Sequence, residues 1–217
     1  TARSIIKLLP ETATTSGAIY LSNREGNEQL DVLSLSGEDL RRMRGSEAAM
    51  VFQEPNSVLN PVYTIGWQIE EGLRAHGMKD KKELRAKSVD ILKKVGIPDA
   101  ETRIDYYPHQ FSGGQRQRLA IARAIVRRPS IYLFDDSFSA LDYRTDQELR
   151  RALKPVTQNA AVIIVAQRIS TIKDADQILV MNQGRIEAVG THEELMQSSR
   201  TYQEIVASQP TDKEVAS

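Results

Sequence analysis

A serine and two glycines at the predicted start of a helix are the first residues in this chain that could bind a ligand. Ser112, Gly113 and Gly114 stand directly before a run with helical spacing that extends to Val126. Backbone N–H groups at a helix N-terminus carry partial positive charge, and glycines let an anion approach them. The pattern indicates a phosphate site. The alternative is an ordinary serine N-cap followed by flexible glycines.

Two adjacent carboxylates form the second candidate group. Asp135 and Asp136 follow the apolar run Ile131–Phe134. Such a run is typical of a strand buried on both faces of a parallel sheet, and Ala161–Ala166 has the same character. Ligands bind α/β proteins at the carboxyl ends of these strands. The pair therefore indicates a ligand site, whereas the alternative is a buried strand that ends in two solvated acids.

Two glutamines also stand at predicted strand ends. Gln53 closes the compact apolar strand that begins at Ala48, and Gln167 follows Ala161–Ala166. Taken alone, an amide at a strand end is as readily structural as functional. A glutamine can hydrogen-bond a phosphate, but it cannot become a cation or shuttle a proton.

The predicted elements around these residues define an α/β fold. Strands are predicted towards both ends, including a hairpin at 176–189, and helices at 64–77, 80–95 and 114–126 lie between them. This order favours a core sheet that carries an inserted helical subdomain. We expect the core to comprise 1–54 and 129–208, the helical subdomain 55–128, and a polar tail 209–217.

Composition narrows the possible functions. The 217 residues carry 29 Lys plus Arg and 29 Asp plus Glu, which argues against nucleic-acid binding held by bulk charge. The longest apolar run is far shorter than the roughly 20 residues that span a bilayer, so any membrane role is expected to act through a partner. Trp67, Tyr106 and Tyr107 are expected to be packing residues. The first residue is Thr1 rather than Met, which favours a fragment or a processed product.

In their order and spacing, the candidate residues resemble the ATP-binding-cassette (ABC) ATPases over about residues 1–208. Phe111–Arg118 is similar to the signature motif and Ile131–Asp136 to the Walker B motif. The segments that resemble the D-loop, the H-loop and the Q-loop are Ser139–Asp142, Val165–Thr171 and Val51–Pro55, respectively. The resemblance implies a core sheet of the P-loop NTPase type.

The resemblance also implies cofactors, partners and a role for each site residue. The cofactors would be ATP and Mg²⁺, and a second ATP-binding domain would complete a dimer. Ser112, Gly113, Gly114 and Gln115 would contact the γ-phosphate of the ATP bound to the facing subunit, with Asp142 of the D-loop beside them. Asp135 and Gln53 would hold Mg²⁺, Asp136 would act as a weak general base, and Gln167 would contact the γ-phosphate.

Two positions depart from the family pattern. The family usually has Glu where this chain has Asp136, and His where it has Gln167. Aspartate is one methylene shorter, and a misplacement of about 1 Å can cost roughly 10²-fold in rate. Together the two departures resemble the degenerate half of a heterodimeric ABC exporter, in which one composite site binds ATP and hydrolyses it poorly.

The phosphate-binding loop of the family, G-x-x-x-x-G-K-[ST], has no match in this sequence. The chain has twelve glycines, and none of them is followed by Lys. That lysine would reach the β- and γ-phosphates. Thr1–Leu9 resembles the helix that this loop normally opens. We therefore expect the 217 residues by themselves to bind ATP feebly and to be inactive.

The two halves of the chain resemble different branches of the family. Val51–Pro61 and Tyr107–Gly114 look like the ATPase subunits of oligopeptide and dipeptide importers. From Gln115 onward, the chain looks like multidrug or lipid exporters. A natural recombinant, an engineered chimera and an assembly join all remain open explanations.

The function expected from the resemblance is that of an ATP-binding subunit or domain of an ABC transporter. It would lie on the cytoplasmic face of the membrane and dock on transmembrane subunits through the helical subdomain. One alternative is a non-catalytic module that lends its signature motif to a partner. Another is a non-transport ABC ATPase that acts on DNA or ribosomes, which the neutral net charge disfavours.

Overall fold

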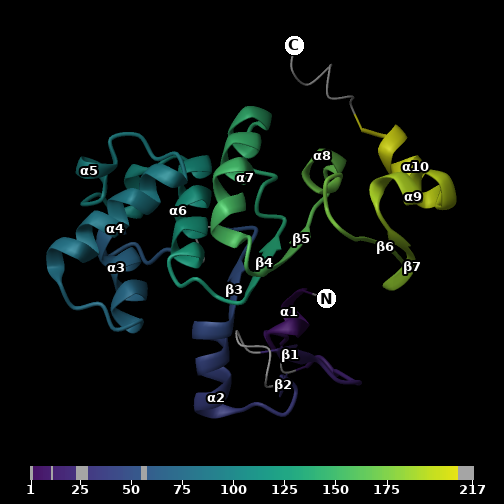
Figure 1. Ribbon diagram of the computed structural model, residues 1–217, viewed down its shortest axis with the longest axis horizontal. Coiled ribbons are helices and arrows are strands. Elements are labelled where there is room, and N and C mark those ends of the chain that lie inside the picture. The colour runs from purple at the N-terminus through teal and green to yellow at the C-terminus, as the bar shows by residue number, and fades with distance from the viewer. Residues whose placement is uncertain (1, 11, 23–28, 55–57, 210–217) are drawn as a thin grey trace.

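The computed structural model describes residues 2–10, 12–22, 29–54 and 58–209 (Figure 1). Of the expected polar tail, residues 210–217 lie outside the described residues. Residues 55–57 of the importer-like stretch also lie outside them. In the part of the chain that the structure describes, no helix combines the length and apolar character needed to cross a bilayer.

A three-stranded parallel sheet lies at the centre of the molecule (Figure 1). Its strands are β3 (Ala48–Val51), β4 (Ile131–Asp135) and β5 (Ala161–Val165), in that spatial order. The parallel pairing confirms the α/β prediction. It also brings the carboxyl ends of all three strands to one edge of the sheet.

The middle strand, β4, is buried on both faces, as predicted. Its alternating side chains enter two different cores, because successive residues of a strand point to opposite faces. Tyr132 and Phe134 pack into the larger core with the helices. Ile131 and Leu133 pack into a second core with the N-terminal elements.

The prediction that residues 161–166 are buried on both faces is wrong for the described chain. Val162, Ile163 and Val165 of β5 keep 41%, 38% and 43% of their surface exposed. The reason is position: β5 is an edge strand of the described sheet, with β4 as its only partner there. An apolar run therefore identified the strand but not its place in the sheet.

The helices between the strands form one group, which contains the three predicted helices and a short fourth one, α5, that was not predicted (Figure 1). They are α3 (Ile65–Ala75), α4 (Lys81–Lys94), α5 (Ala100–Arg103) and α6 (Gly113–Ile125), with a 3₁₀ turn at Pro108–Gln110. Asp80 caps α4, since its carboxylate accepts the N–H of Glu83 at 2.8 Å. α6 packs against β3 and places Leu119 and Ile121, both fully buried, in the larger core.

The N-terminal elements cover the other face of the sheet. They are α1 (Ala2–Ile5), the antiparallel strands β1 (Tyr20–Ser22) and β2 (Gln29–Asp31), and α2 (Gly37–Arg42), followed by a π-helical turn at Met43–Glu47. The sequence analysis did not predict β2.

Two helices, α7 (Tyr143–Thr157) and α8 (Ile169–Ile172), precede the C-terminal elements. The predicted hairpin is confirmed: β6 (Ile178–Asn182) pairs antiparallel with β7 (Arg185–Gly190). Gln183 and Gly184 both have positive φ, as the tight hairpin turn requires. With α9 (His192–Ser198) and α10 (Arg200–Ala207), the hairpin encloses a small core of its own.

Candidate functional site

Three predicted site residues from three different strand ends meet at Asp136. Gln53, just beyond β3, donates from Nε2 to Asp136 Oδ2 at 3.2 Å. Gln167, just beyond β5, donates from Nε2 to the same oxygen at 3.1 Å. Two amide groups therefore orient one carboxylate and use only one of its two oxygens.

The backbone around Asp136 is held firmly at the strand end. Its φ is 48°, a left-handed conformation that Asp adopts more readily than most residues. The Asp136 N–H donates to Val165 O at 2.9 Å, and Ser139 Oγ donates to Asp136 O at 2.9 Å. Ser137, fully buried, donates to Val51 O at 2.8 Å and ties the loop back to β3.

Asp135 lies beside this cluster but has a different neighbour. Its Oδ2 is 3.6 Å from Arg3 Nε of α1, and both side chains are partly solvent-accessible, so the pair contributes little to stability. Asp135 therefore adds a second carboxylate at the carboxyl edge of the sheet.

The chemistry of these side chains fits a hard cation such as Mg²⁺. Asp135 offers carboxylate oxygens, and Gln53, whose Nε2 points to Asp136, still has its Oε1 as an acceptor. Among the described residues, no group of three His, Cys, Asp or Glu side chains could hold a metal. Mg²⁺ is commonly bound through one or two carboxylates plus substrate phosphates rather than by an all-protein cage. The donor set at Asp135 fits this mode.

The Ser112 region forms a second, separate cluster at the start of α6. Ser112 Oγ accepts the N–H of Gln115 at 3.3 Å, and Gln115 Oε1 accepts the N–H of Ser112 at 3.0 Å. This capping box leaves the N–H groups of Gly113 and Gly114 without an acceptor inside the helix. The serine is therefore an N-cap, and the N–H groups of the two glycines remain candidate donors to an anion.

Gly114 also brings the α6 turn against the loop before α7. A Cβ on Gly114 would lie 3.5 Å from Leu141 Cδ2 and 3.8 Å from Ala140 O, which is ordinary contact. The predicted signature turn and the predicted D-loop are therefore neighbours within this chain.

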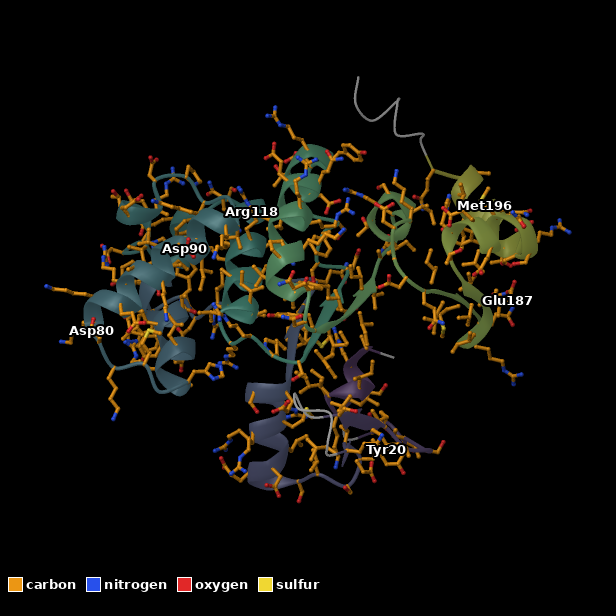
Figure 2. All side chains as sticks on the ribbon, in the orientation of Figure 1. Tyr20, Asp80, Asp90, Arg118, Glu187 and Met196 are labelled. Atoms are coloured by element: carbon orange, nitrogen blue, oxygen red, sulfur yellow. The ribbon has the colours of Figure 1, made fainter. Side chains whose placement is uncertain are left out.

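Asp142 acts as the N-cap of α7. Its carboxylate accepts the N–H of Thr145 at 2.9 Å. This backbone hydrogen bond, then that of the Thr145 side chain, lowers the pKa of Asp142 below its usual value, and the charge of nearby Arg118 lowers it further. Arg118 lies on α6 at the side of α7 (Figure 2).

The lowered pKa of Asp142 predicts a pH-dependent contribution to stability. The contribution is complete above the ordinary Asp pKa of 3.8 and is lost as pH falls through the lower pKa of the folded state. Asp142→Asn keeps an N-cap acceptor but removes the titrating charge. We expect the parent to have the higher urea midpoint at pH 7, and the difference to shrink below pH 3.8. A difference that stays constant from pH 7 to pH 3 would contradict this prediction.

Three further residues hold the site in position through hydrogen bonds to its loops. The sequence analysis gave none of them a role. Gln117, fully buried in α6, donates from Nε2 to Phe52 O at 3.2 Å, next to Gln53. The guanidinium of Arg168 donates to Ser139 O at 3.0 Å and Leu141 O at 3.1 Å. Gln209 contacts the backbone on both sides of Arg168. No spacing in the sequence pointed to these contacts, because each joins segments far apart in the chain.

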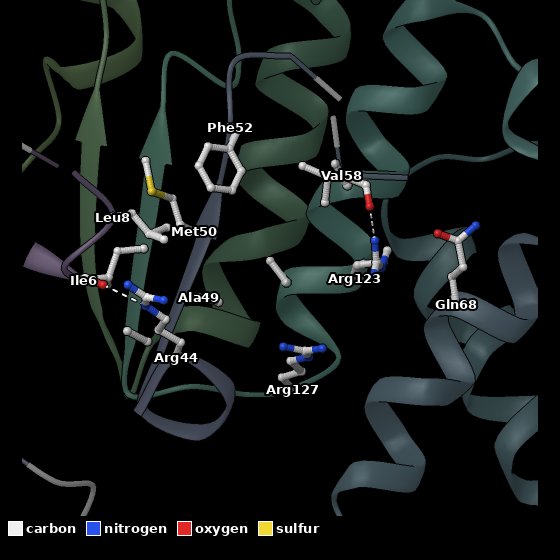
Figure 3. Close-up of a pocket in the computed structure, with 13 residues that line it drawn as sticks. Ile6, Leu8, Arg44, Ala49, Met50, Phe52, Val58, Gln68, Arg123 and Arg127 are labelled. Atoms are coloured by element: carbon white, nitrogen blue, oxygen red, sulfur yellow. Dashed lines mark hydrogen bonds between the residues drawn. The ribbon is translucent and has the colours of Figure 1, made fainter. Parts of the chain in front are cut away.

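A groove lies between β3 and the helices α3 and α6 (Figure 3). One hollow of about 180 Å³ is lined by Arg44, Arg123 and Arg127 together with apolar side chains such as Phe52. Arg44 donates to Ile6 O at 2.9 Å, and Arg123 donates to Val58 O (Figure 3). The groove therefore combines apolar walls with several guanidinium groups.

A larger hollow of about 590 Å³ adjoins it and is lined by Tyr63 and Trp67. These rings stack with centroids 3.9 Å apart, and each residue keeps 41% of its surface exposed. The prediction that Trp67 is a packing residue is therefore only half right, because one face packs on Tyr63 and the rest meets solvent. Tyr106 and Tyr107 are likewise 36% and 40% exposed.

The fold and the site together define an α/β protein whose candidate site lies at the carboxyl edge of a parallel sheet, where proteins of this class bind ligands. The profile of the ABC transporter family matches residues 2–139, and the chain belongs to this family. The sequence prediction of the family is thereby confirmed.

Curated relatives carry names from peptide import. "Dipeptide transport ATP-binding protein DppD" of Bacillus subtilis (strain 168) is 34% identical over 200 residues, which cover 90% of this chain and 58% of that protein. A putative peptide import ATP-binding protein of Brucella abortus (strain 2308) is 42% identical over 158 residues, which cover 71% of this chain and 48% of that protein. The chain thus spans about half to three fifths of the length of these relatives.

Solved structures of ABC cassettes share the fold. One, described as the "Dimeric structure of a post-hydrolysis state of the ATP-binding cassette MJ0796 bound to ADP and Pi", is similar with a TM-score of 0.72 and 27% identity, covering 82% of this chain and 74% of that chain. Another, the "Structure of a bacterial Atm1-family ABC exporter with ATP bound", has a TM-score of 0.70 and 31% identity, covering 87% of this chain and 32% of that chain. The predicted fold class, a P-loop NTPase-type core, is confirmed.

Proposed function

We propose that this chain is the ATP-binding part of an ABC transporter that couples ATP binding and hydrolysis to transport of a peptide or of a drug-like or lipid-like substrate. The observation that carries the proposal is the meeting of Gln53 and Gln167 on Asp136, beside Asp135, at the carboxyl edge of the sheet. The relatives named for peptide import support the transport assignment.

We assign the site residues as follows. Asp135 and Gln53 hold Mg²⁺, which supplies charge neutralisation to the phosphates when it is bound. Asp136 is the weak general base for the attacking water, and Gln167 contacts the γ-phosphate. The N–H groups of Gly113 and Gly114, with the hydroxyl of Ser112 and the side chain of Gln115, bind the γ-phosphate of ATP held by a facing domain.

The proposed site hydrolyses ATP weakly. Asp136 is one methylene shorter than the glutamate usual in the family, and Gln167 cannot carry a positive charge. The chain would act as the weakly hydrolytic partner in a dimer of ATP-binding domains. Since no glycine in the sequence is followed by lysine, we also propose that the 217 residues alone bind ATP poorly.

We propose that the chain is divided into core segments 1–54 and 129–208, a helical subdomain 55–128 and a tail 209–217. Transmembrane subunits would dock on the helical subdomain, on the cytoplasmic side of the membrane. The groove between β3, α3 and α6 supports this assignment, because its exposed Tyr63–Trp67 stack and its arginines suit a helix with apolar and acidic side chains.

Replacing Trp67 by alanine is expected to weaken binding of the transmembrane subunits by about 30-fold, since a central aromatic anchor contributes about 2 kcal/mol. The fold of α3 should survive. The hydrogen bonds at Trp67 use its backbone N–H, to Thr64 Oγ1, and its backbone carbonyl, from Arg74. Affinity is measured by titrating the purified chain onto membrane subunits in detergent.

Tyr20→Ala is the matched control. Tyr20 is 62% exposed and lies on β1, away from the helical group (Figure 2). The Tyr20→Ala variant should bind the membrane subunits with the same affinity as the parent. Equal affinities for the parent and Trp67→Ala would place the docking surface elsewhere. Co-purification with nucleic acid or ribosomes in place of membrane subunits would favour the non-transport alternative.

The non-catalytic alternative keeps the same fold and dimer but assigns no hydrolysis to Asp136. Asp136 and Gln167 favour this non-catalytic alternative, because the family usually has Glu and His at these two positions. The two proposals differ in whether restoring those groups restores turnover.

A further inference from the structure

One side chain near the end of the described chain holds the loop that carries Gln167. Gln209 Oε1 accepts the N–H of Ile169 at 2.8 Å, and Gln209 Nε2 donates to Gln167 O at 2.6 Å. The Gln209 amide thus bonds to the carbonyl of one residue and to the N–H of the residue two positions later. A neighbouring β-strand would bond to a backbone in the same way. Gln209 joins the end of α10 to a loop 40 residues earlier in the sequence.

The loop depends on this contact because α8 has little else to start it. Helix α8 has only four residues, and its N-cap, Arg168, makes no side-chain capping bond. Gln209 therefore supplies an acceptor that the first N–H group of α8 needs. Ile169 and Ile172 of α8 also pack on the small C-terminal core, which includes Tyr202 of α10.

The other side of the same loop contacts the site. Gln167 Nε2 donates to Asp136 Oδ2 at 3.1 Å, and Arg168 donates to the carbonyls of Ser139 and Leu141. Residues 167–169 thus connect the C-terminal helices, on one side, with the carboxylate and the loop before α7, on the other.

We propose that Gln209 is a positioning residue for Asp136. It holds residues 167–169 so that the Gln167 amide orients the carboxylate, and the C-terminal helix pair α9–α10 thereby controls the geometry of the site. The inference rests on the proposed function, because the orientation of Asp136 matters for turnover only if Asp136 acts on the attacking water.

The test is NMR spectroscopy of the 217-residue chain and of Gln209→Ala. We expect the Ile169 amide to exchange with solvent about tenfold faster, as loss of one hydrogen bond predicts. We also expect the Gln167 side-chain amide signals to move towards those of a free glutamine. Unchanged amide signals of β6 and β7 would show that the C-terminal unit remains folded.

Two further variants sharpen the result. Gln203→Ala removes the same residue type from α10, the helix that precedes Gln209, but Gln203 Nε2 donates to Met196 O at 2.7 Å, inside the C-terminal unit. It should leave Ile169 and Gln167 unchanged. Gln209→Glu keeps an acceptor for Ile169 and loses the donor to Gln167 O, so the Gln167 signals should shift while exchange at Ile169 stays near that of the parent.

The proposal is overturned if Gln167 keeps its parent signals in Gln209→Ala, even when Ile169 exchanges faster, because Gln209 would then only cap α8. In an assembly that hydrolyses ATP, Gln209→Ala should lower kcat about tenfold and change the KM for ATP less than twofold, and an unchanged kcat would also overturn it. A parent assembly without turnover would refute the proposed function alone, and the NMR result would still decide on Gln209.

Discussion

The double variant Asp136→Glu, Gln167→His is expected to hydrolyse ATP about 10²-fold faster than the parent site, which corresponds to about 2.7 kcal/mol in the barrier. The longer carboxylate recovers about 1 Å of reach towards the attacking water. The imidazole restores a group that can carry charge beside the γ-phosphate. The assay measures phosphate release by the dimer, with the chain joined to a G-x-x-x-x-G-K-[ST] loop because its own 217 residues contain none.

One structural effect opposes this gain. Residue 136 has a φ of 48°, a conformation that costs most L-residues about 1–2 kcal/mol and that Asp tolerates better than Glu. This strain lowers the stability of the loop and does not directly raise the barrier to hydrolysis. Because the hydrogen bonds of Ser137 and Ser139 hold the loop, we expect it to keep its conformation and the increase in rate to prevail.

The single variants and one further substitution are the controls. Asp136→Glu alone should recover part of the rate, and Gln167→His alone less, because the base would remain short. Asp136→Asn should abolish the residual turnover. If the double variant gains nothing while its fold and ATP binding match the parent, the proposal of a weak catalytic site is wrong, and the non-catalytic module becomes the better description.

Leu119→Ala is expected to destabilise the 217-residue chain by about 3 kcal/mol and to lower Tm by about 10 °C. Leu119 is fully buried in α6, in the larger core shared by the helices and the sheet. The loss combines the removed apolar contacts with the cavity that remains, since tightly packed neighbours relax only partly. Urea and thermal unfolding measure the effect.

Leu179→Ala is the matched control, because Leu179 is 50% exposed on β6. It should change the free energy of unfolding by less than about 0.5 kcal/mol, as exposed positions generally do. Similar losses for both leucines would mean that α6 is not packed as the structure describes.

Much of the site could be predicted from the sequence because each candidate residue stands at the end of an element. The apolar run before Asp135 predicted a buried strand, and parallel pairing then required the neighbouring strand ends to meet. The convergence of Gln53 and Gln167 on one oxygen of Asp136 could not be predicted. It depends on loop conformations and on the left-handed backbone at Asp136, which no local pattern encodes.

Errors in the prediction have the same origin. The apolar run 161–166 predicted a strand but not its exposure, because burial depends on which strands lie beside it. Trp67 was assigned to packing by its residue type, yet its place near the start of α3 leaves it in an open groove. Residue type alone does not decide which side of a helix has a neighbour.

The sequence by itself determined the family, the α/β class, the helix cap at Ser112, and the departures at Asp136 and Gln167, since local patterns and residue identities carry all of these. Only the tertiary structure decided which side chains meet. Gln209 reaches the Gln167 loop, and Gln117 reaches Phe52, through hydrogen bonds between segments about 40 and 65 residues apart. Such contacts arise when distant elements pack on a common core, so they have no signature in the order of the residues.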